Sequence, residues 1–169
     1  MGSKWVFCIK WGPNGAIQKY KACVIMQGFT QIEGVDYDKT FMPVAKLSSL
    51  RAILAIAVEH DLEVHQMDVK SAYLNGELEE EIFMEPPPGF NIPKGMVLRL
   101  VKVVYRTKQG GQVWYKNIKT RLESMGYAHT EANHAMFTCF WDSKITIIAL
   151  YIDDFTMACK DLEVIKHDK

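Results

Sequence analysis

The chain has 169 residues, with twenty basic and twenty acidic side chains and 49% apolar positions. This length allows one domain with a buried core, or one domain and a small lobe. A net charge of zero argues against strong non-specific nucleic-acid binding, and the absence of a signal peptide or an 18-residue apolar run indicates neither secretion nor a membrane span.

The first elements form a predicted hairpin. Residues 5–10 and 17–26 have the composition of strands, and Gly12-Pro13-Asn14-Gly15 between them is a strong turn signal. Lys19 and Lys21 alternate with apolar neighbours, so we expect both to point to one side of the second strand.

A helix is predicted next, over residues 49–60 with Ser48 as its N-cap. Its apolar residues follow the spacing of a helix buried on one side: Leu50, Ile53, Leu54 and Ala57. Residues 63–69 then read as a strand that ends at Asp68.

The middle of the chain is less regular. We expect the acidic run 77–81 to be a solvated face, and Pro86-Pro87-Pro88-Gly89 to be a rigid loop inside the domain. Residues 97–105 read as another strand.

The last part predicts a helix over 113–125 that Gly126 ends, then a strand over 136–141, and a terminal helix from 161 to 169. Trp114, Ile118 and Leu122 share one stripe of the first of these helices. Strands and helices follow without βαβ repetition, which indicates an α+β fold.

The run 145–159 is β-branched and aromatic, and the adjacent acids Asp153 and Asp154 interrupt it. The pattern predicts two buried strands with a turn at this pair. Two like charges against apolar strands are unfavourable unless a cation holds them, so the pair marks a candidate site.

Asp68 is a third acid at the end of an apolar strand. If this strand lies beside the 145–159 hairpin, Asp68 meets Asp153 at the end of the sheet. Converging carboxylates predict a site for Mg²⁺ or Mn²⁺, hard cations that prefer oxygen ligands. Two such ions promote in-line attack of a 3′-hydroxyl on an α-phosphate.

Gln66-Met67-Asp68-Val69-Lys70-Ser71-Ala72-Tyr73-Leu74-Asn75-Gly76, followed much later by Tyr151-Ile152-Asp153-Asp154, closely resembles the reverse transcriptase of Ty1/copia-type LTR retrotransposons. The resemblance extends through most of the chain. Further blocks fit its pattern in order: Lys4-Trp5-Val6-Phe7, Tyr20-Lys21-Ala22, Gly28-Phe29-Thr30-Gln31, Asp36-Tyr37, Thr40-Phe41, Pro43-Val44, Glu85 with Pro87 to Phe90, Lys108-Gln109 and Trp114-Tyr115.

This resemblance implies a right-hand polymerase fingers-palm fold, with an antiparallel palm sheet backed by helices. Residues 1–169 would form a single fingers-palm unit, with 1–47 mainly fingers and 48–169 mainly palm. The thumb and RNase H parts of the family polyprotein would be absent from the chain and present in an intact element. The implied partners are an RNA or DNA template-primer and deoxynucleoside triphosphates, in an intracellular protein whose compartment is open.

The family's site residues transfer position by position. The resemblance implies that Asp68, Asp153 and Asp154 are catalytic, and that they hold Mg²⁺ or Mn²⁺ together with Val69. It also implies that Lys21 faces the triphosphate and Tyr73 is the steric gate against a 2′-hydroxyl, with Lys108 and Gln109 shaping the nucleotide pocket.

The chain departs from the family pattern at five positions. Cys23 and Gln112 stand where the family has arginine, Gln27 replaces a basic residue, Arg106 a glycine and Gly111 a proline. Loss of a phosphate-binding arginine slows phosphoryl transfer, and a side chain at position 106 distorts a loop that needs glycine torsions.

Two alternatives to an RNA-directed DNA polymerase therefore stay open. One is a catalytically dead relic that folds and binds nucleic acid, and the other, more remote, is a two-metal nuclease. A zinc site at His129, His134 and Cys139 is disfavoured, since these residues lack paired ligand spacing.

Overall fold

The computed structural model describes residues 1–141 and 144–160, and it divides into two compact units. The first unit contains Met1–Phe41 and Tyr73–Trp114, and the second contains Met42–Ala72 and the chain from Tyr115 onward. The helix predicted over 161–169 lies outside the described residues. No described helix combines the length and apolar character needed to cross a membrane.

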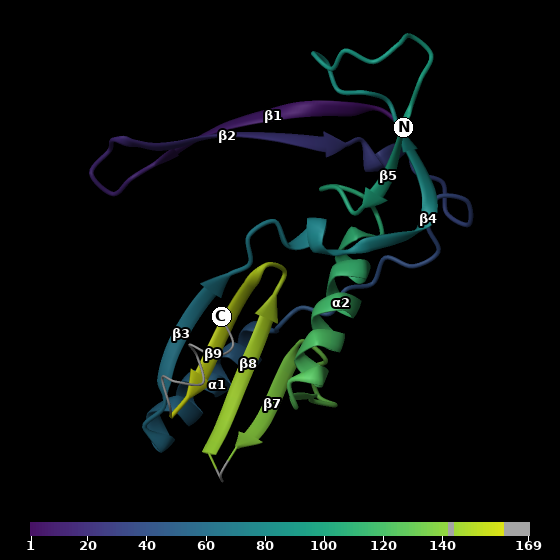
Figure 1. Cartoon of the computed structure of the whole chain (residues 1–169). Coiled ribbons are helices and arrows are strands. Elements are labelled where there is room, and N and C mark those ends of the chain that lie inside the picture. The colour runs from purple at the N-terminus through teal and green to yellow at the C-terminus, as the bar shows by residue number, and fades with distance from the viewer. Residues whose placement is uncertain (142–143, 161–169) are drawn as a thin grey trace. The chain divides into compact units, whose positions relative to one another are not determined.

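The first unit opens with the predicted hairpin, a long ribbon of β1 (Ser3–Trp11) and β2 (Ile17–Met26) (Figure 1). Its register pairs Lys4 with Ile25, Cys8 with Lys21, and Lys10 with Lys19. Directly paired residues share a face, and successive residues alternate between faces. One side of the ribbon, here called the lysine face, therefore carries Lys4, Lys10, Lys19 and Lys21.

A second two-stranded sheet in this unit joins β4 (Glu77–Met84) to β5 (Leu98–Lys102). The acidic run 77–81 is thus part of a strand, which the sequence analysis did not predict, and its exposed glutamates form the solvated face that was predicted. Glutamates at alternate positions are exposed, while Ile82 and Met84 pack with Met26 in a buried cluster. β5 is shorter at both ends than the strand predicted over 97–105.

Two short 3₁₀ turns complete the first unit: η1 (Gly28–Thr30) and η2 (Ala72–Asn75), the latter beginning at the last residue of the second unit's first segment. Pro86–Gly89 lies in a loop, as predicted.

The second unit is built on one antiparallel five-stranded sheet, in the order β3-β9-β8-β7-β6. The strands are β3 (Glu63–Asp68), β6 (Ala128–His129), β7 (Met136–Trp141), β8 (Lys144–Tyr151) and β9 (Asp154–Cys159). β8 and β9 are almost entirely buried because their β-branched and aromatic residues face core on both sides.

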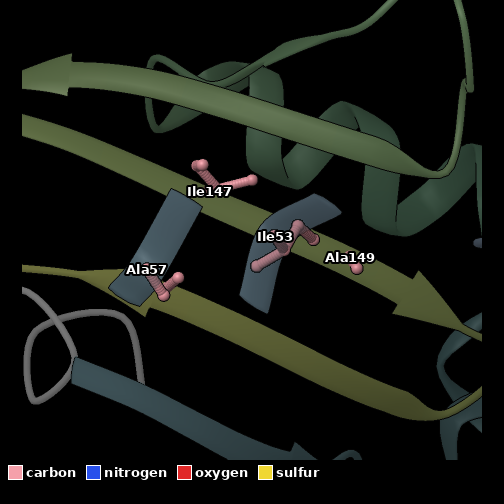
Figure 2. Close-up of a cluster of buried hydrophobic side chains, with 5 residues drawn as sticks. Ile53, Ala57, Ile147 and Ala149 are labelled. Atoms are coloured by element: carbon pink, nitrogen blue, oxygen red, sulfur yellow. The ribbon is translucent and has the colours of Figure 1, made fainter. Parts of the chain in front are cut away.

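Helix α1 (Leu47–His60) packs on this sheet. Figure 2 shows Ile53 and Ala57 of the helix against Ile147 and Ala149 of β8. Two details of the predicted helix were wrong. The N-cap is Lys46 and makes no side-chain cap bond, so Ser48 lies inside the helix, and Leu54 is 46% exposed because the buried stripe is narrower than predicted.

Helix α2 (Gly110–Ser124) begins three residues before the predicted start. The N–H of Val113 donates to the carbonyl of Gln109, which extends the helical turn backwards. Trp114 and Leu122 are buried, as predicted, and Gly126 follows the helix with a φ of +91°, the conformation of a C-terminal glycine stop.

Candidate active site

The backbone positions of the acidic residues singled out in the sequence lie at one end of the five-stranded sheet. β3 pairs with β9, so Asp68 lies directly opposite Asp154. The N–H of Val69 donates to the carbonyl of Asp153 over 2.9 Å. The prediction that the Asp68 strand lies beside the 145–159 hairpin is therefore confirmed.

The turn between β8 and β9 is tighter than predicted. Tyr151 pairs with Asp154, so the two central residues are Ile152 and Asp153, and the predicted centre at Asp153-Asp154 was wrong by one residue. Ile152 has a φ of +59°. A positive φ at the first central position only is typical of a type II′ turn, where glycine is normal and a β-branched residue costs roughly 1–2 kcal/mol.

Buried strands on both sides hold this strained turn. Leu150 before it is fully buried and Phe155 after it is 5% exposed. The carboxylates themselves are accessible, since Asp68 is exposed and Asp153 and Asp154 are half-buried. Strain retained at an accessible acidic turn is typical of functional sites.

Convergence of the side chains themselves stays a prediction. Within residues 1–141 and 144–160, no three His, Cys, Asp or Glu side chains are grouped closely enough to hold a metal ion. The nearest partner of Asp154 is Gln66, whose Nε2 donates to Oδ1 over a long 3.4 Å. The available donors are three carboxylates and the carbonyl of Val69, an all-oxygen set of the kind that Mg²⁺ and Mn²⁺ prefer.

The residues predicted to bind the nucleotide lie in the first unit. Lys21 is exposed on the lysine face of the ribbon. Tyr73 meets the ring of Tyr105 edge-on, with 5.1 Å between ring centroids. A Cβ on Gly110 would lie 2.6 Å from Oγ1 of Thr107, 2.9 Å from Cγ1 of Val103 and 3.2 Å from the Tyr73 ring, so this glycine leaves space for all three side chains.

Gln109 and Lys108 differ sharply in exposure. Lys108 is exposed, whereas Gln109 is 1% exposed and both ends of its amide are hydrogen-bonded within the protein. Its Oε1 accepts from Nε2 of Gln31 over 3.1 Å, and its Nε2 donates to the carbonyl of Asp36 over 3.0 Å. Gln31 in turn accepts from the N–H of Lys108 over 2.7 Å. Gln109 therefore positions the loop rather than presenting its amide to solvent.

Sequence reasoning gave Gln31 no role. It is 7% exposed and links the 28–37 segment to the loop before α2. Its only signal in the sequence is its place in the Gly28-Phe29-Thr30-Gln31 block, because a single glutamine gives no local indication that it is buried.

Arg106 occupies a left-handed backbone conformation, with a φ of +70°. The expectation that position 106 needs glycine torsions is confirmed. A Cβ on Gly28 would collide with the carbonyl oxygen of Arg106, so these two loop backbones touch. The close approach requires glycine at position 28. Arg106, by contrast, adopts a left-handed backbone conformation that residues with a side chain disfavour.

His129 and His134 lie together at the β6–β7 end of the sheet, with 5.2 Å between ring centroids. Nδ1 of His129 is 3.3 Å from Oε1 of Glu123. Beside them the Tyr115 hydroxyl donates to the carbonyl of His134 over 2.8 Å. Burial, and secondarily the negative charge of Glu123, raise the pKa of Tyr115.

Comparison with known proteins gives a consistent result. Residues 1–169 match the family model described as reverse transcriptase (RNA-dependent DNA polymerase). Retrovirus-related Pol polyproteins from transposon TNT 1-94 of Nicotiana tabacum and from transposon RE2 of Arabidopsis thaliana are 41% identical over 161 residues and 34% identical over 170 residues. A third, from transposon RE1 of Arabidopsis thaliana, is 32% identical over 164 residues.

These matches cover 94%, 99% and 95% of this chain but only 12%, 12% and 11% of the relatives, so the chain spans about an eighth of their length. No solved structure matches the chain significantly. The whole-length family match and the transposon relatives agree with the resemblance carried by the Asp68 and Asp153-Asp154 motifs. The chain belongs to the reverse transcriptase (RNA-dependent DNA polymerase) family.

Proposed function

We propose that this chain is the fingers-palm portion of a copia-type reverse transcriptase, which extends a primer 3′-hydroxyl with deoxynucleoside triphosphates on an RNA or DNA template. The observation that carries the proposal is the pairing of Asp68 with Asp154 beside the strained Ile152-Asp153 turn. In this assignment the second unit corresponds mainly to the palm and the first mainly to the fingers.

Asp68, Asp153 and Asp154, with the carbonyl of Val69, would hold two divalent cations. When bound, Mg²⁺ would lower the pKa of the primer hydroxyl and neutralise charge on the leaving pyrophosphate. The protein's own contribution to this site is the placement of the ligands. The β3–β9 register keeps Asp68 and Asp154 on facing positions at the end of the sheet.

Residues of the first unit would bind the nucleotide. Lys21, which is exposed, would contact the triphosphate, and Tyr73, whose ring packs edge-on against Tyr105, would exclude a 2′-hydroxyl. Lys108 would contact phosphate, and Gln109 would act by positioning Lys108 through Gln31.

Primer extension on poly(rA)·oligo(dT) with Mg²⁺ or Mn²⁺ tests this function. Wild type is expected to incorporate nucleotide and Asp153→Asn is not. Asp38→Asn, which removes an exposed aspartate of the first unit, is the matched control and should retain incorporation. Equal incorporation by wild type and Asp153→Asn would remove the catalytic assignment.

A second candidate is a catalytically dead relic that still folds and binds nucleic acid. The observation that favours it is Arg106, which holds a glycine conformation at +70° in the loop that carries Lys108. A folded wild-type chain that binds template-primer without incorporation, in either metal, would establish this candidate. Strand cleavage without added nucleotides would instead indicate a two-metal nuclease.

A further inference from the structure

The β1–β2 ribbon has a second face, opposite the lysine face, that carries no charged residue. Side chains alternate along each strand and directly paired residues share a face, so this side consists of the residues that the lysine face leaves out. From its base to the turn it carries Trp5, Phe7, Ile9 and Trp11 of β1 and Ile17, Tyr20, Ala22 and Val24 of β2. We call this surface the aromatic face.

The rest of the first unit covers only the base of the aromatic face. Nε1 of Trp5 donates to the carbonyl of Pro88 over 2.9 Å, and the Trp5 ring lies 6.3 Å from that of Phe90. Farther along the ribbon, the rings face solvent. The exposed fractions are 75%, 71% and 61% for Phe7, Tyr20 and Trp11.

A two-stranded ribbon with an apolar face needs a surface to pack against. Among the described residues, β1 and β2 pair only with each other, and an isolated two-stranded hairpin is at best marginally stable in water. A contiguous exposed apolar patch on a soluble protein marks an interaction site, and aromatic residues are enriched at the cores of protein interfaces. The aromatic face therefore has the composition of one half of an interface.

The distribution of charge on the ribbon selects the partner. Ser3–Met26 contains four lysines and no acid, and all four lysines lie on the other face. A polyanion is therefore attracted to the lysine face and not to the aromatic face. Two aromatic faces can meet without like-charge repulsion, whereas two lysine faces would repel each other. The aromatic face is thus the side of the ribbon that is complementary to a second copy of itself.

The area of the aromatic face suits a weak dimer. An aromatic side chain buries about 150–250 Å² when it is covered completely, so the three exposed rings offer about 300–500 Å² together. Ile9 and Ile17, which are 42% and 43% exposed, add about 50–100 Å². Two copies would therefore bury about 700–1,200 Å² in total, the size of weak and transient complexes and not of obligate ones.

We propose that two copies of this chain pack their aromatic faces together, so that two β1–β2 ribbons form a four-stranded sandwich about a two-fold axis. Both copies use the same surface, so the contact closes at two chains. Trp11 and Tyr20 are its anchors, because tryptophan and tyrosine dominate the binding energy of protein interfaces. The lysine faces point outward and leave Lys21 accessible, so this dimer goes beyond the proposed function and does not depend on it.

Sedimentation velocity of the full chain over a concentration series tests the dimer. Wild type should show a reversible monomer–dimer equilibrium with a Kd in the micromolar range, and its average mass should level off at two chains. Added salt should leave this Kd unchanged or lower it, because the contact has no opposite charges to screen while the lysines of the two ribbons repel each other.

Tyr20→Lys places a like charge in both halves of the contact and should raise the Kd at least about 10-fold. Phe140→Lys is the matched control, because Phe140 is 70% exposed and lies on β7 in the second unit. It should dimerise like wild type. Both substitutions are at exposed positions, so the melting temperatures should equal that of wild type. Trp11→Lys tests the same face at a second position if Tyr20→Lys melts lower.

A wild type that stays monomeric throughout the series would overturn the proposal, and so would equal Kd values for Tyr20→Lys and Phe140→Lys. An average mass that rises beyond two chains would refute a closed two-fold contact. Monomeric wild type that binds phosphatidylcholine vesicles, with binding lost in Tyr20→Lys, would assign the aromatic face to a lipid surface instead. Primer extension is a separate measurement, so its absence refutes the polymerase and leaves the dimer standing.

Discussion

Gly28→Ala is the most severe single-methyl change that the structure identifies. The new Cβ would collide with the carbonyl oxygen of Arg106, lie 3.0 Å from its carbonyl carbon and 3.2 Å from Oε1 of Gln31. Two of these atoms belong to backbone, so no side-chain rotation relieves the contact. The 28–31 and 106–109 segments must separate.

The magnitude follows from what the separation breaks. Overpacking of a tight site costs about 1–3 kcal/mol. Moving Gln31 also disrupts its bonds to Lys108 and Gln109, each worth about 1 kcal/mol. The sum is about 3–5 kcal/mol, which lowers the melting temperature of a chain of this size by roughly 6–20 °C.

Differential scanning calorimetry measures this effect, and Gly34→Ala is the matched control. Gly34 has a positive φ of +77°, unlike Gly28, and a Cβ there meets nothing within 4 Å. Its substitution costs about 1 kcal/mol of backbone strain, partly offset by a less flexible unfolded chain. Similar melting temperatures for the two variants would refute the backbone contact between Gly28 and Arg106.

Two further predictions concern the same contacts, and a third concerns Tyr115. Gln31→Leu should destabilise the protein by about 2–4 kcal/mol, because it leaves the Lys108 N–H and Oε1 of Gln109 unpaired. Adding Gln109→Leu to this variant should cost less than it does in wild type, and additive denaturation energies would contradict the shared network. Arg106→Gly should stabilise the protein by about 1 kcal/mol in urea titrations, since it removes an arginine from a left-handed backbone conformation. An unchanged or lower urea midpoint would contradict the inference that the backbone at Arg106 is strained. Burial and Glu123 raise the pKa of Tyr115, so its contribution to stability is complete below pH 10, the usual tyrosine value, and falls as pH rises further. Tyr115→Phe should abolish this part of the alkaline destabilisation, and an unchanged alkaline melting curve would exclude it.

Much of the secondary structure follows from local patterns in the sequence. The Gly12–Gly15 turn between two alternating segments specifies the β1–β2 ribbon, since hairpin register depends on the turn and on strand alternation. The apolar run 145–159 specifies two buried strands because its residues are β-branched and aromatic. The family motifs identified Asp68, Asp153 and Asp154 as candidate catalytic residues. The β3–β9 register places Asp68 opposite Asp154.

Other features depend on residues far apart in the chain. Gln31 and Gln109 are separated by 78 positions, and neither shows from its neighbours that it is buried and paired. The run 77–81 is polar at most positions and becomes part of a strand that pairs with β5 on either side of it, at Glu77 and at Ile82–Met84. Ile152 takes the strained place in the turn because the β8–β9 register sets Tyr151 opposite Asp154.

The sequence by itself determined the hairpins, the helices and the identity of the acidic residues, because these depend on periodicity and motif within short windows. The tertiary structure decided which backbone atoms touch. The closeness of Gly28 to Arg106 and the burial of Gln109 arise from the meeting of two loops, and a pattern confined to either loop carries no information about the other.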